Sequence, residues 1–329
     1  MAVEQVVSPA AVLETVVGAV RAHPGLRNKA PIGLVAEVFG AGDWLAGPGD
    51  DGAVVVDDGA TMVVGGESIW PPFLEADPFG AGVAAVLANV NDLAAMGARP
   101  LAIVDTVTGP EPVARRALEG MRHASALYQV PVVGGHLTIR DGPPALSAFG
   151  LGRADGPVLS ARHAAAGQGL LVACCVEGTM RADFPFFASF DARGTRLGGD
   201  VRTLAAVAGS GAAVAAKDVS MAGLLGSLAM LLECHQLGVT VDLEALPRPA
   251  GVSLPAWVVA FPCFAFLLCA PAGREEDCAR PFRERGLQAA VVGVLDDTGT
   301  LRVRLGAETA TVMDLTTESV TGLPPAVGS

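Results

Sequence analysis

Two adjacent carboxylates stand in a glycine-flanked turn, Pro-Gly-Asp-Asp-Gly-Ala at 48–53. Asp50 and Asp51 directly precede an apolar run that is typical of a strand. Carboxylate oxygens are good ligands for Mg²⁺, and carboxylates cannot approach the phosphates of ATP unless a cation lies between them. The pair therefore indicates either a metal site or an ordinary solvated turn, since Asp and Gly are also the commonest turn residues.

A third carboxylate lies in a segment with helical spacing, from about Pro78 to Met96. Apolar residues follow one face, while the opposite face carries alanines, Asn89 and Asp92 where water would favour charges. Asn89 and Asp92 are neighbours at i and i+3, and Asp92 lies near the C-terminal end, where the helix dipole disfavours an anion. A carboxylate in that position indicates a ligand site.

A glycine pair follows a third apolar run, in Val-Pro-Val-Val-Gly-Gly-His-Leu-Thr at 130–138. Gly134 and Gly135 could let backbone amides close on an anion beside His136 and Thr138. A β-bulge with a surface histidine explains the same pattern.

In the second half of the chain, Lys217, Asp218 and Ser220 precede an apolar helix expected near 221–237. Ser220 also fits the role of a helix N-cap.

These residues are embedded in alternating strands and helices, which predict an α/β fold. The first half gives a hairpin at 53–56 and 61–64, a strand at 101–107, a helix at 111–128 and a strand at 130–133, with 145–152 closing the sheet. A short amphipathic helix is expected at the N-terminus. A Gly, Ala and Pro-rich stretch near 153–169 is the best boundary, so we expect domains at 1–155 and 156–329. The second unit begins with a strand at 170–176, continues through apolar strands at 256–269 and ends in a strand pair.

Composition narrows the possible partners of the 329-residue chain. The net charge of −12 argues against nucleic acid and against an anionic membrane surface. Residues 249–273 are uncharged, but three prolines divide them into strand-length pieces, so a membrane helix is not the favoured interpretation. The six cysteines form no Cys-x-x-Cys pair, which favours a reduced, cytoplasmic protein. Only two lysines occur, Lys29 and Lys217, so phosphates would have to be bound by arginine, backbone amides or a metal as well.

In order along 49–271, these segments resemble the aminoimidazole ribonucleotide synthetase-related (PurM-like) superfamily, which includes selenophosphate synthetase and thiamine-monophosphate kinase. The block Asn-Val-Asn-Asp-Leu-Ala-Ala-Met-Gly at 89–97 is the most specific. Gly-Gly-His-Leu-Thr at 134–138 is similar to segments of both enzymes, and Asp-Val-Ser-Met-Ala-Gly-Leu-Leu-Gly at 218–226 is similar to a segment of the selenophosphate synthetases.

The resemblance implies two α/β domains, a homodimer built by the N-terminal sheets, and a cleft that binds ATP and Mg²⁺, in some members with a monovalent cation. It implies Mg-ATP-dependent phosphoryl transfer to an oxygen of a small molecule by a kinase or a synthetase. A nucleotide-binding regulatory or scaffold subunit without catalysis is the alternative. The residues that it assigns to metal binding are Asp50, Asp51, Glu67 and Asp92. Those assigned to catalysis are Asp51, Asp92 and Asp218, and those assigned to the nucleotide are Asn89, Asn91, Gly134, Gly135, His136, Thr138, Lys217 and Ser220.

The chain also departs from these relatives. It has no cysteine followed by lysine before the acidic pair, which disfavours selenophosphate synthesis. Ala222 stands where the thiamine-phosphate kinases have an aspartate, and Gln168 interrupts a common Gly-Asp. The Phe-rich stretch 181–191 matches no relative, and we expect its aromatic rings to pack in the core and not to stack on a substrate.

Overall fold

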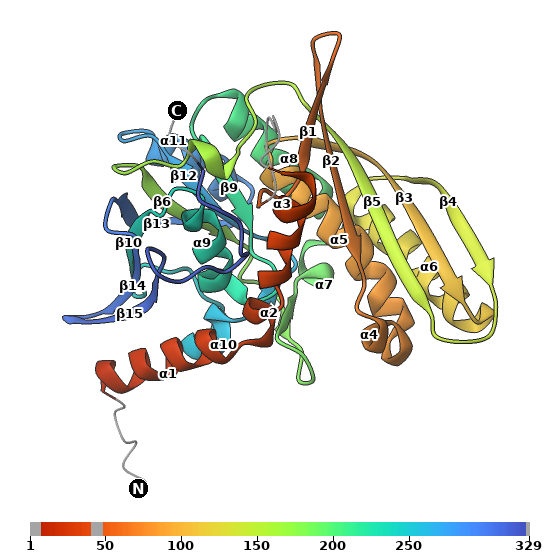
Figure 1. The fold of residues 1–329 in the computed structure, drawn as a ribbon, viewed down its shortest axis with the longest axis horizontal. Helices are drawn as coiled ribbons and strands as arrows, with labels where there is room; N and C mark the ends of the chain where they lie inside the picture. The colour runs from red at the N-terminus through yellow and green to blue at the C-terminus, as the bar shows by residue number, and fades with distance from the viewer. Residues whose placement is uncertain (1–7, 41–48, 327–329) are drawn as a thin grey trace, which may run out of the picture.

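The computed structural model describes residues 8–40 and 49–326, and in it two β-sheets lie side by side, each with its own helices (Figure 1). The N-terminal sheet has the strand order β1-β2-β5-β3-β4. Its strands are β1 (Ala53–Asp57), β2 (Ala60–Ser68), β3 (Arg99–Gly109), β4 (Val132–Ile139) and β5 (Ala145–Ala154). The predicted α/β class is confirmed.

The order of this sheet corrects two expectations. β5 does not close the sheet but lies in its middle, antiparallel to both β2 and β3. The reason is the connection from β3 through a helix to β4, which places β4 parallel to β3 on its outer side and leaves the inner side free. The strand expected at 130–133 is also displaced, because β4 begins at Val132 and runs through both glycines to Ile139.

Two long helices cover one face of the N-terminal sheet: α5 (Pro78–Ala95) and α6 (Glu111–Tyr128). Asp77 caps α5 by accepting a hydrogen bond from the Gly80 amide at 2.8 Å, and Pro78 occupies the first helical position. The helices pack backbone against backbone. A Cβ atom at Gly82 would lie 1.9 Å from the Ala117 carbonyl oxygen, and one at Gly120 would lie 2.1 Å from that of Phe79.

The C-terminal half is built on a seven-stranded sheet of order β15-β14-β10-β13-β6-β12-β9. Its strands are β6 (Gly169–Cys174), β9 (Ala215–Asp218), β10 (Gly238–Asp242), β12 (Ala265–Ala270), β13 (Gln288–Asp296), β14 (Thr300–Leu305) and β15 (Glu308–Asp314). A small sheet holds β7 (Thr179–Met180), β8 (Phe186–Ala188) and β11 (Phe261–Pro262). The remaining elements of this half are η2 (Ala161–His163), α7 (Phe190–Arg193), α8 (Arg196–Gly209), α9 (Gly223–Glu233), α10 (Leu254–Val258) and α11 (Glu275–Glu284).

Part of the segment expected to form apolar strands is instead the helix α10. Ser253 accepts a hydrogen bond from the Ala256 amide, and Pro255 lies in the first turn, so a capped helix begins here. None of the helices within the described residues is both long enough and apolar enough to span a bilayer.

Before the first strand the chain forms four helical elements: α1 (Pro9–Ala22), α2 (Pro24–Arg27), η1 (Ala30–Ile32) and α3 (Gly33–Phe39). A short helix after β2, α4 (Pro71–Ala76), leads into α5. The expected N-terminal helix is thus present from Pro9, and its first residues, 1–7, lie outside the described residues. Leu13, Val16 and Val20 of α1 pack into the core of the C-terminal half. The division at 155/156 stays a prediction.

The Phe-rich stretch forms the β7–β8 hairpin and α7, and most of its rings pack internally. Phe187 is buried against Trp257, and Phe186 lies between Phe190 and Phe261. Phe184 is 38% exposed and stacks on Phe73 of α4. Packing against other rings of the protein therefore accounts for most of this stretch, and Phe184 is the exposed exception.

Candidate metal and nucleotide site

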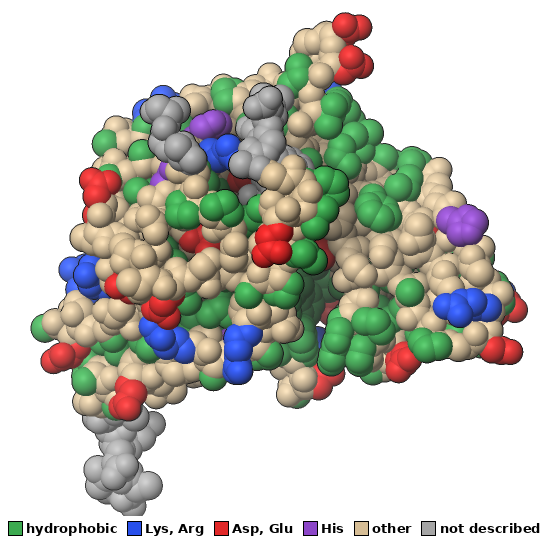
Figure 2. All heavy atoms as spheres, viewed as in Figure 1, with side chains coloured by type: hydrophobic (Ala, Val, Ile, Leu, Met, Phe, Trp, Pro, Cys, Tyr) green, Lys and Arg blue, Asp and Glu red, His purple; other side chains and the backbone are tan. Residues whose placement is uncertain are grey.

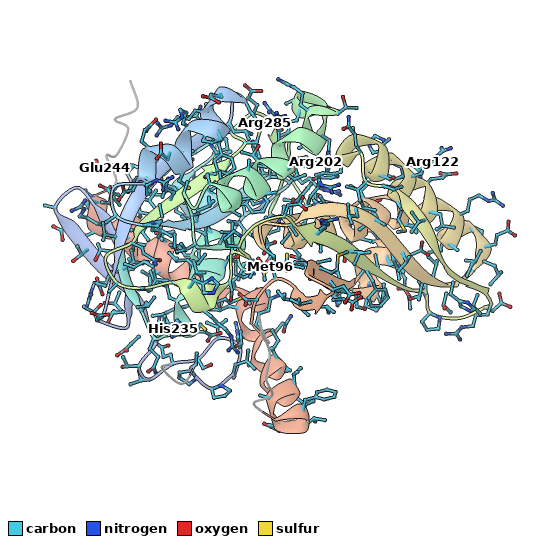
Figure 3. The ribbon with its side chains drawn as sticks, turned by 90° about the horizontal axis from the view of Figure 1, so that it is seen from above. Met96, Arg122, Arg202, His235, Glu244 and Arg285 are labelled. Carbon is cyan, nitrogen blue, oxygen red and sulfur yellow. The ribbon has the colours of Figure 1, made fainter. Side chains whose placement is uncertain are left out.

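Three carboxylates converge where the two halves of the molecule meet. Each of Asp51, Asp92 and Asp218 offers an oxygen atom within 4.8 Å of the others. Asp51 lies in the loop before β1, Asp92 in the last turns of α5 and Asp218 at the end of β9, so both sheets contribute. Figure 3 shows Met96, the residue that follows α5, at the centre of the molecule. The amide of Leu159 donates to its carbonyl at 3.1 Å, which ties α5 to the second half of the chain.

Gly65 of β2 lies against both Asp51 and Asp92. A Cβ atom there would lie 3.5 Å from the backbone oxygen of Asp51 and 4.0 Å from the Cβ of Asp92. Glu67 follows two residues later and so shares this face of the strand. Glu67 therefore stands beside the cluster but outside the group of three.

Lys217 supplies a positive charge inside the cluster. Its Nζ forms ion pairs with Asp51 and with Oδ1 of Asp218, the latter at 3.0 Å. The Asp218 amide also donates to Oδ2 of Asp51 at 2.9 Å. Burial by itself would lower the pKa of Lys217, but the carboxylates of Asp51 and Asp218 raise it above its usual range. The ammonium therefore stays charged.

Burial and mutual repulsion make these carboxylates hard to ionise without a cation. Burial raises the pKa of Asp51 to about 7, against the opposing effect of Lys217. Burial, and then the charges of Asp218, Asp51 and Glu67, raise the pKa of Asp92 well above its usual range. Burial raises the pKa of Glu67 as well. Several hard oxygen donors that repel one another suit Mg²⁺, which relieves the repulsion when it binds.

Asp50 lies apart from the cluster, although it is adjacent to Asp51. Its carboxylate accepts hydrogen bonds from Ser160 Oγ at 2.6 Å and from the Ala161 amide at 2.7 Å, at the start of η2. Successive side chains in extended backbone point in opposite directions, so neighbours in sequence rarely reach one ion. The structure does not bring Asp50 into the three-carboxylate group.

The two asparagines of α5 are buried and point to different places. Asn89 donates to the carbonyls of Ala85 and Ala148, so it faces the sheet and not the cluster. Asn91 donates across the junction to the Cys263 carbonyl at 3.3 Å. The Oδ1 atoms of both remain without a hydrogen-bond partner among the described residues. Asn91 is thus the better placed to meet a ligand between the halves.

Gly134, Gly135, His136 and Thr138 lie on β4, at the edge of the N-terminal sheet farthest from β1. His136 and Thr138 contact each other at 3.2 Å and are not near the three carboxylates, which lie beyond β3 and β5. A Cβ at Gly135 would lie 2.6 Å from the Asp105 carbonyl oxygen, so that glycine serves the strand pairing. Within one chain these residues and the cluster are separate.

Ser220 does not cap α9 with its side chain. Its amide donates to Ser227 Oγ at 3.1 Å, and the N-cap is Ala222, whose φ of 87° is unusual for a residue other than glycine.

Lys29 is the functional candidate that sequence reasoning did not assign, and its charge is the main influence that opposes the rise in the pKa of Glu67. The scarcity of lysine in the sequence could have pointed to Lys29, because Lys217 pairs with the cluster and the charge of Lys29 acts on Glu67 beside it.

Comparison with known proteins gives two matches that together cover most of the chain. The family model "AIR synthase related protein, N-terminal domain" matches residues 49–154, and "AIR synthase related protein, C-terminal domain" matches residues 194–306. The cluster residues lie within these two segments. Uncharacterized protein sll0787 of Synechocystis sp. is 33% identical over 277 residues, which are 83% of this chain and 86% of that protein.

Solved structures have the same fold at low sequence identity. PurL of T. maritima, complexed with FGAR, superposes with a TM-score of 0.75 at 17% identity, over 96% of this chain and 54% of PurL. The chain therefore spans about half of that protein. AaThiL complexed with AMPPCP and TMP superposes with a TM-score of 0.64 at 17% identity, over 84% of this chain and 94% of AaThiL.

Proposed function

The chain belongs to the AIR synthase related (PurM-like) family of ATP-using enzymes, and from this premise we propose that it transfers the γ-phosphoryl group of Mg-ATP to an oxygen of a small molecule. The product is either a phosphorylated compound or an activated phosphate that reacts onward. The observation that carries the proposal is the convergence of Asp51, Asp92 and Asp218 from both halves of the molecule.

The carboxylates would hold Mg²⁺, which neutralises charge on the phosphates during transfer. Asp51 and Asp92 face each other across Gly65, so they would hold the ion from the N-terminal side. Asp218 would hold it from the C-terminal side, and Glu67 stands near enough to take part through water. Closure of the two halves on a substrate would complete this set and exclude water.

Two further observations support a nucleotide as the ligand. Asn91 is buried at the junction, and its amide oxygen has no hydrogen-bond partner among the described residues, so a bound water or a rearrangement on nucleotide binding would be needed to pair it. Structural relatives of this fold bind adenine nucleotides, among them AaThiL with AMPPCP and T. maritima PurL with ATP.

A homodimer would use the open face of the N-terminal sheet. Paired registers place Val55, Val64, Val104, Phe149 and Leu151 on the face opposite α5 and α6, and all five are more than a third exposed. Figure 2 shows hydrophobic side chains gathered over β2 and β5. An exposed apolar sheet face of this kind is typical of a protein interface. Sedimentation of the wild type against a Phe149→Glu variant tests this, and a wild type that stays monomeric at micromolar concentration contradicts it.

Calorimetric titration with ATP, in Mg²⁺ and then in EDTA, tests the site. We expect Mg²⁺-dependent binding in the wild type, loss of it in Asp51→Asn, and retention in Asp50→Asn, the matched control one residue away. Binding followed by ADP release with some member of a substrate panel supports phosphoryl transfer. Binding without ADP release across the panel favours a nucleotide-binding subunit without catalysis, and equal binding in EDTA rejects the metal site.

A further inference from the structure

One of the two lysines of the chain is buried among the carboxylates that would hold the metal. The side chain of Lys217 is 6% exposed, and Nζ is paired with both Asp51 and Asp218. Such a cation costs solvation energy to bury, and it stays only where anions surround it. The carboxylates of the cluster are therefore what holds Lys217 in this buried position.

The backbone does not force this arrangement. β9 is the edge strand of its sheet, and consecutive residues of a strand point to opposite faces. The Lys217 side chain nevertheless returns to the Asp218 carboxylate beside it and also reaches Asp51. The ammonium thus bridges two carboxylates that come from opposite halves of the molecule, as a divalent cation would.

The carboxylates of the cluster differ in the hydrogen bonds and ion pairs that they receive. Asp51 receives both Lys217 Nζ and the Asp218 amide, whereas within residues 8–40 and 49–326 no hydrogen bond or ion pair reaches the Asp92 carboxylate. An oxygen of Asp92 nevertheless lies within 4.8 Å of an oxygen of Asp51 and of Asp218. Positive charge is provided between Asp51 and Asp218, and it is lacking at Asp92.

We propose that Lys217 takes the place of one divalent cation between Asp51 and Asp218, so that the site accepts a single Mg²⁺, beside Asp92 and within reach of the other two carboxylates. The inference rests on the proposed metal site. A tethered ammonium needs no free ion to be captured, and it keeps the two halves joined when no metal is bound. The lysine is a positioning residue on this view, and it is not a ligand of the ATP phosphates.

Metal stoichiometry distinguishes these roles without nucleotide. Mn²⁺ is titrated into metal-free protein and the unbound ion is followed by electron paramagnetic resonance. We expect one Mn²⁺ per chain in the wild type and two in Lys217→Met, which has a side chain of similar length but no charge. Arg21→Met, which removes an exposed cation that pairs with Glu318 and not with the cluster, should bind one. A single ion in Lys217→Met overturns the inference while leaving the proposed function intact. No Mn²⁺ bound by the wild type overturns the metal site itself.

Thermal unfolding gives a second test that does not depend on counting ions. Without the ammonium, Asp51 and Asp218 repel each other across the junction, so Lys217→Met should melt well below the wild type in EDTA. Saturating Mg²⁺ should restore most of that difference, because the added ion replaces the lost charge. If Lys217→Met remains unfolded or unrestored in Mg²⁺, the lysine is not exchangeable with a cation and the inference is wrong.

Discussion

The acidic cluster and the glycine-containing strand β4 are two regions with equally suggestive sequences and different outcomes. Asp51, Asp92 and Asp218 are far apart in sequence and meet within 4.8 Å. Gly134, Gly135, His136 and Thr138 are contiguous, yet they lie along the opposite edge of the N-terminal sheet. Residues that are adjacent in the sequence need not belong to the site. A carboxylate in a buried position is the better indicator, because an isolated charge is not tolerated in apolar surroundings.

Substitution in the cluster should have the largest effect. Asp92→Asn removes a proposed metal ligand, and we expect Mg-ATP turnover to fall by at least about 100-fold, on the scale of roughly 3 kcal/mol of transition-state stabilisation. Once an acceptor is known, the rate of ADP formation measures the loss of turnover. Until then, the Mg²⁺-dependent affinity for ATP measures the loss of the metal site. A variant with near-normal values for both would place the metal elsewhere.

The raised pKa values of the cluster predict a pH dependence that metal should remove. The pKa of Asp51 is raised to about 7 when folded, so the folded protein binds the proton more tightly than the unfolded chain. The contribution of Asp51 to the free energy of unfolding is therefore greatest at low pH and is lost as pH rises from about 4 to about 7. One pKa unit corresponds to about 1.4 kcal/mol, so the change should reach a few kcal/mol.

Urea unfolding of the wild type and Asp51→Asn in EDTA isolates this contribution, because the asparagine does not titrate. We expect the wild type to lose stability relative to the variant between pH 4 and 7, and Mg²⁺ to cancel the loss. A relative gain over that range would mean that Asp51 is ionised throughout and that Lys217 outweighs burial.

Asp50→Asn should affect the fold more than the metal. The change weakens the charge-assisted hydrogen bonds from Ser160 and Ala161, which we expect to lower the free energy of unfolding by about 1–2 kcal/mol. Mg²⁺ affinity should stay within about twofold of the wild type, since Asp50 lies outside the cluster. A tenfold loss of Mg²⁺ affinity in a folded variant would return Asp50 to the metal site.

His136→Ala should have the smallest effect. His136 is exposed, and among the described residues its side chain has a hydrogen-bond partner only in Thr138, so the free energy of unfolding should change by no more than about 0.5 kcal/mol. ATP affinity should be unchanged in a monomer. A marked loss of affinity in a dimer would mean that a second chain carries β4 to its partner's cluster, and the contrast between the two regions would then hold only within one chain.

Much of the fold could be predicted because local patterns agree with the final structure. The boundaries of α5 and α6 follow from Asp77, Pro78 and the apolar spacing. Asp92 could be identified because a carboxylate near a helix C-terminus is unfavourable unless something compensates it. The place of β5 in the sheet could not be predicted from the sequence. It depends on the direction of the β3–β4 connection and not on the sequence of β5.

The separation of Asp50 from Asp51 could not be predicted for the same reason, because it depends on parts of the chain that are distant in sequence. A turn with two aspartates tells which residues can ligate a cation, but the direction of each side chain depends on backbone angles and on η2, more than a hundred residues later. The ion pair between Lys217 and Asp51 joins residues 166 positions apart. Only tertiary structure creates such a pair, although the scarcity of lysine indicated where to look.

The close contact between α5 and α6 has a consequence for how fast and how tightly a cation can be taken up. With glycines at 82 and 120 against the opposing backbones, α5 cannot roll about its axis without a collision. The direction of the Cα–Cβ bond of Asp92 is therefore set when the protein folds, so ordering of the helix does not oppose capture of the ion. A bulkier residue at Gly120 would leave every proposed ligand in place chemically and would still slow and weaken capture, because the helix would present its carboxylate over a range of angles.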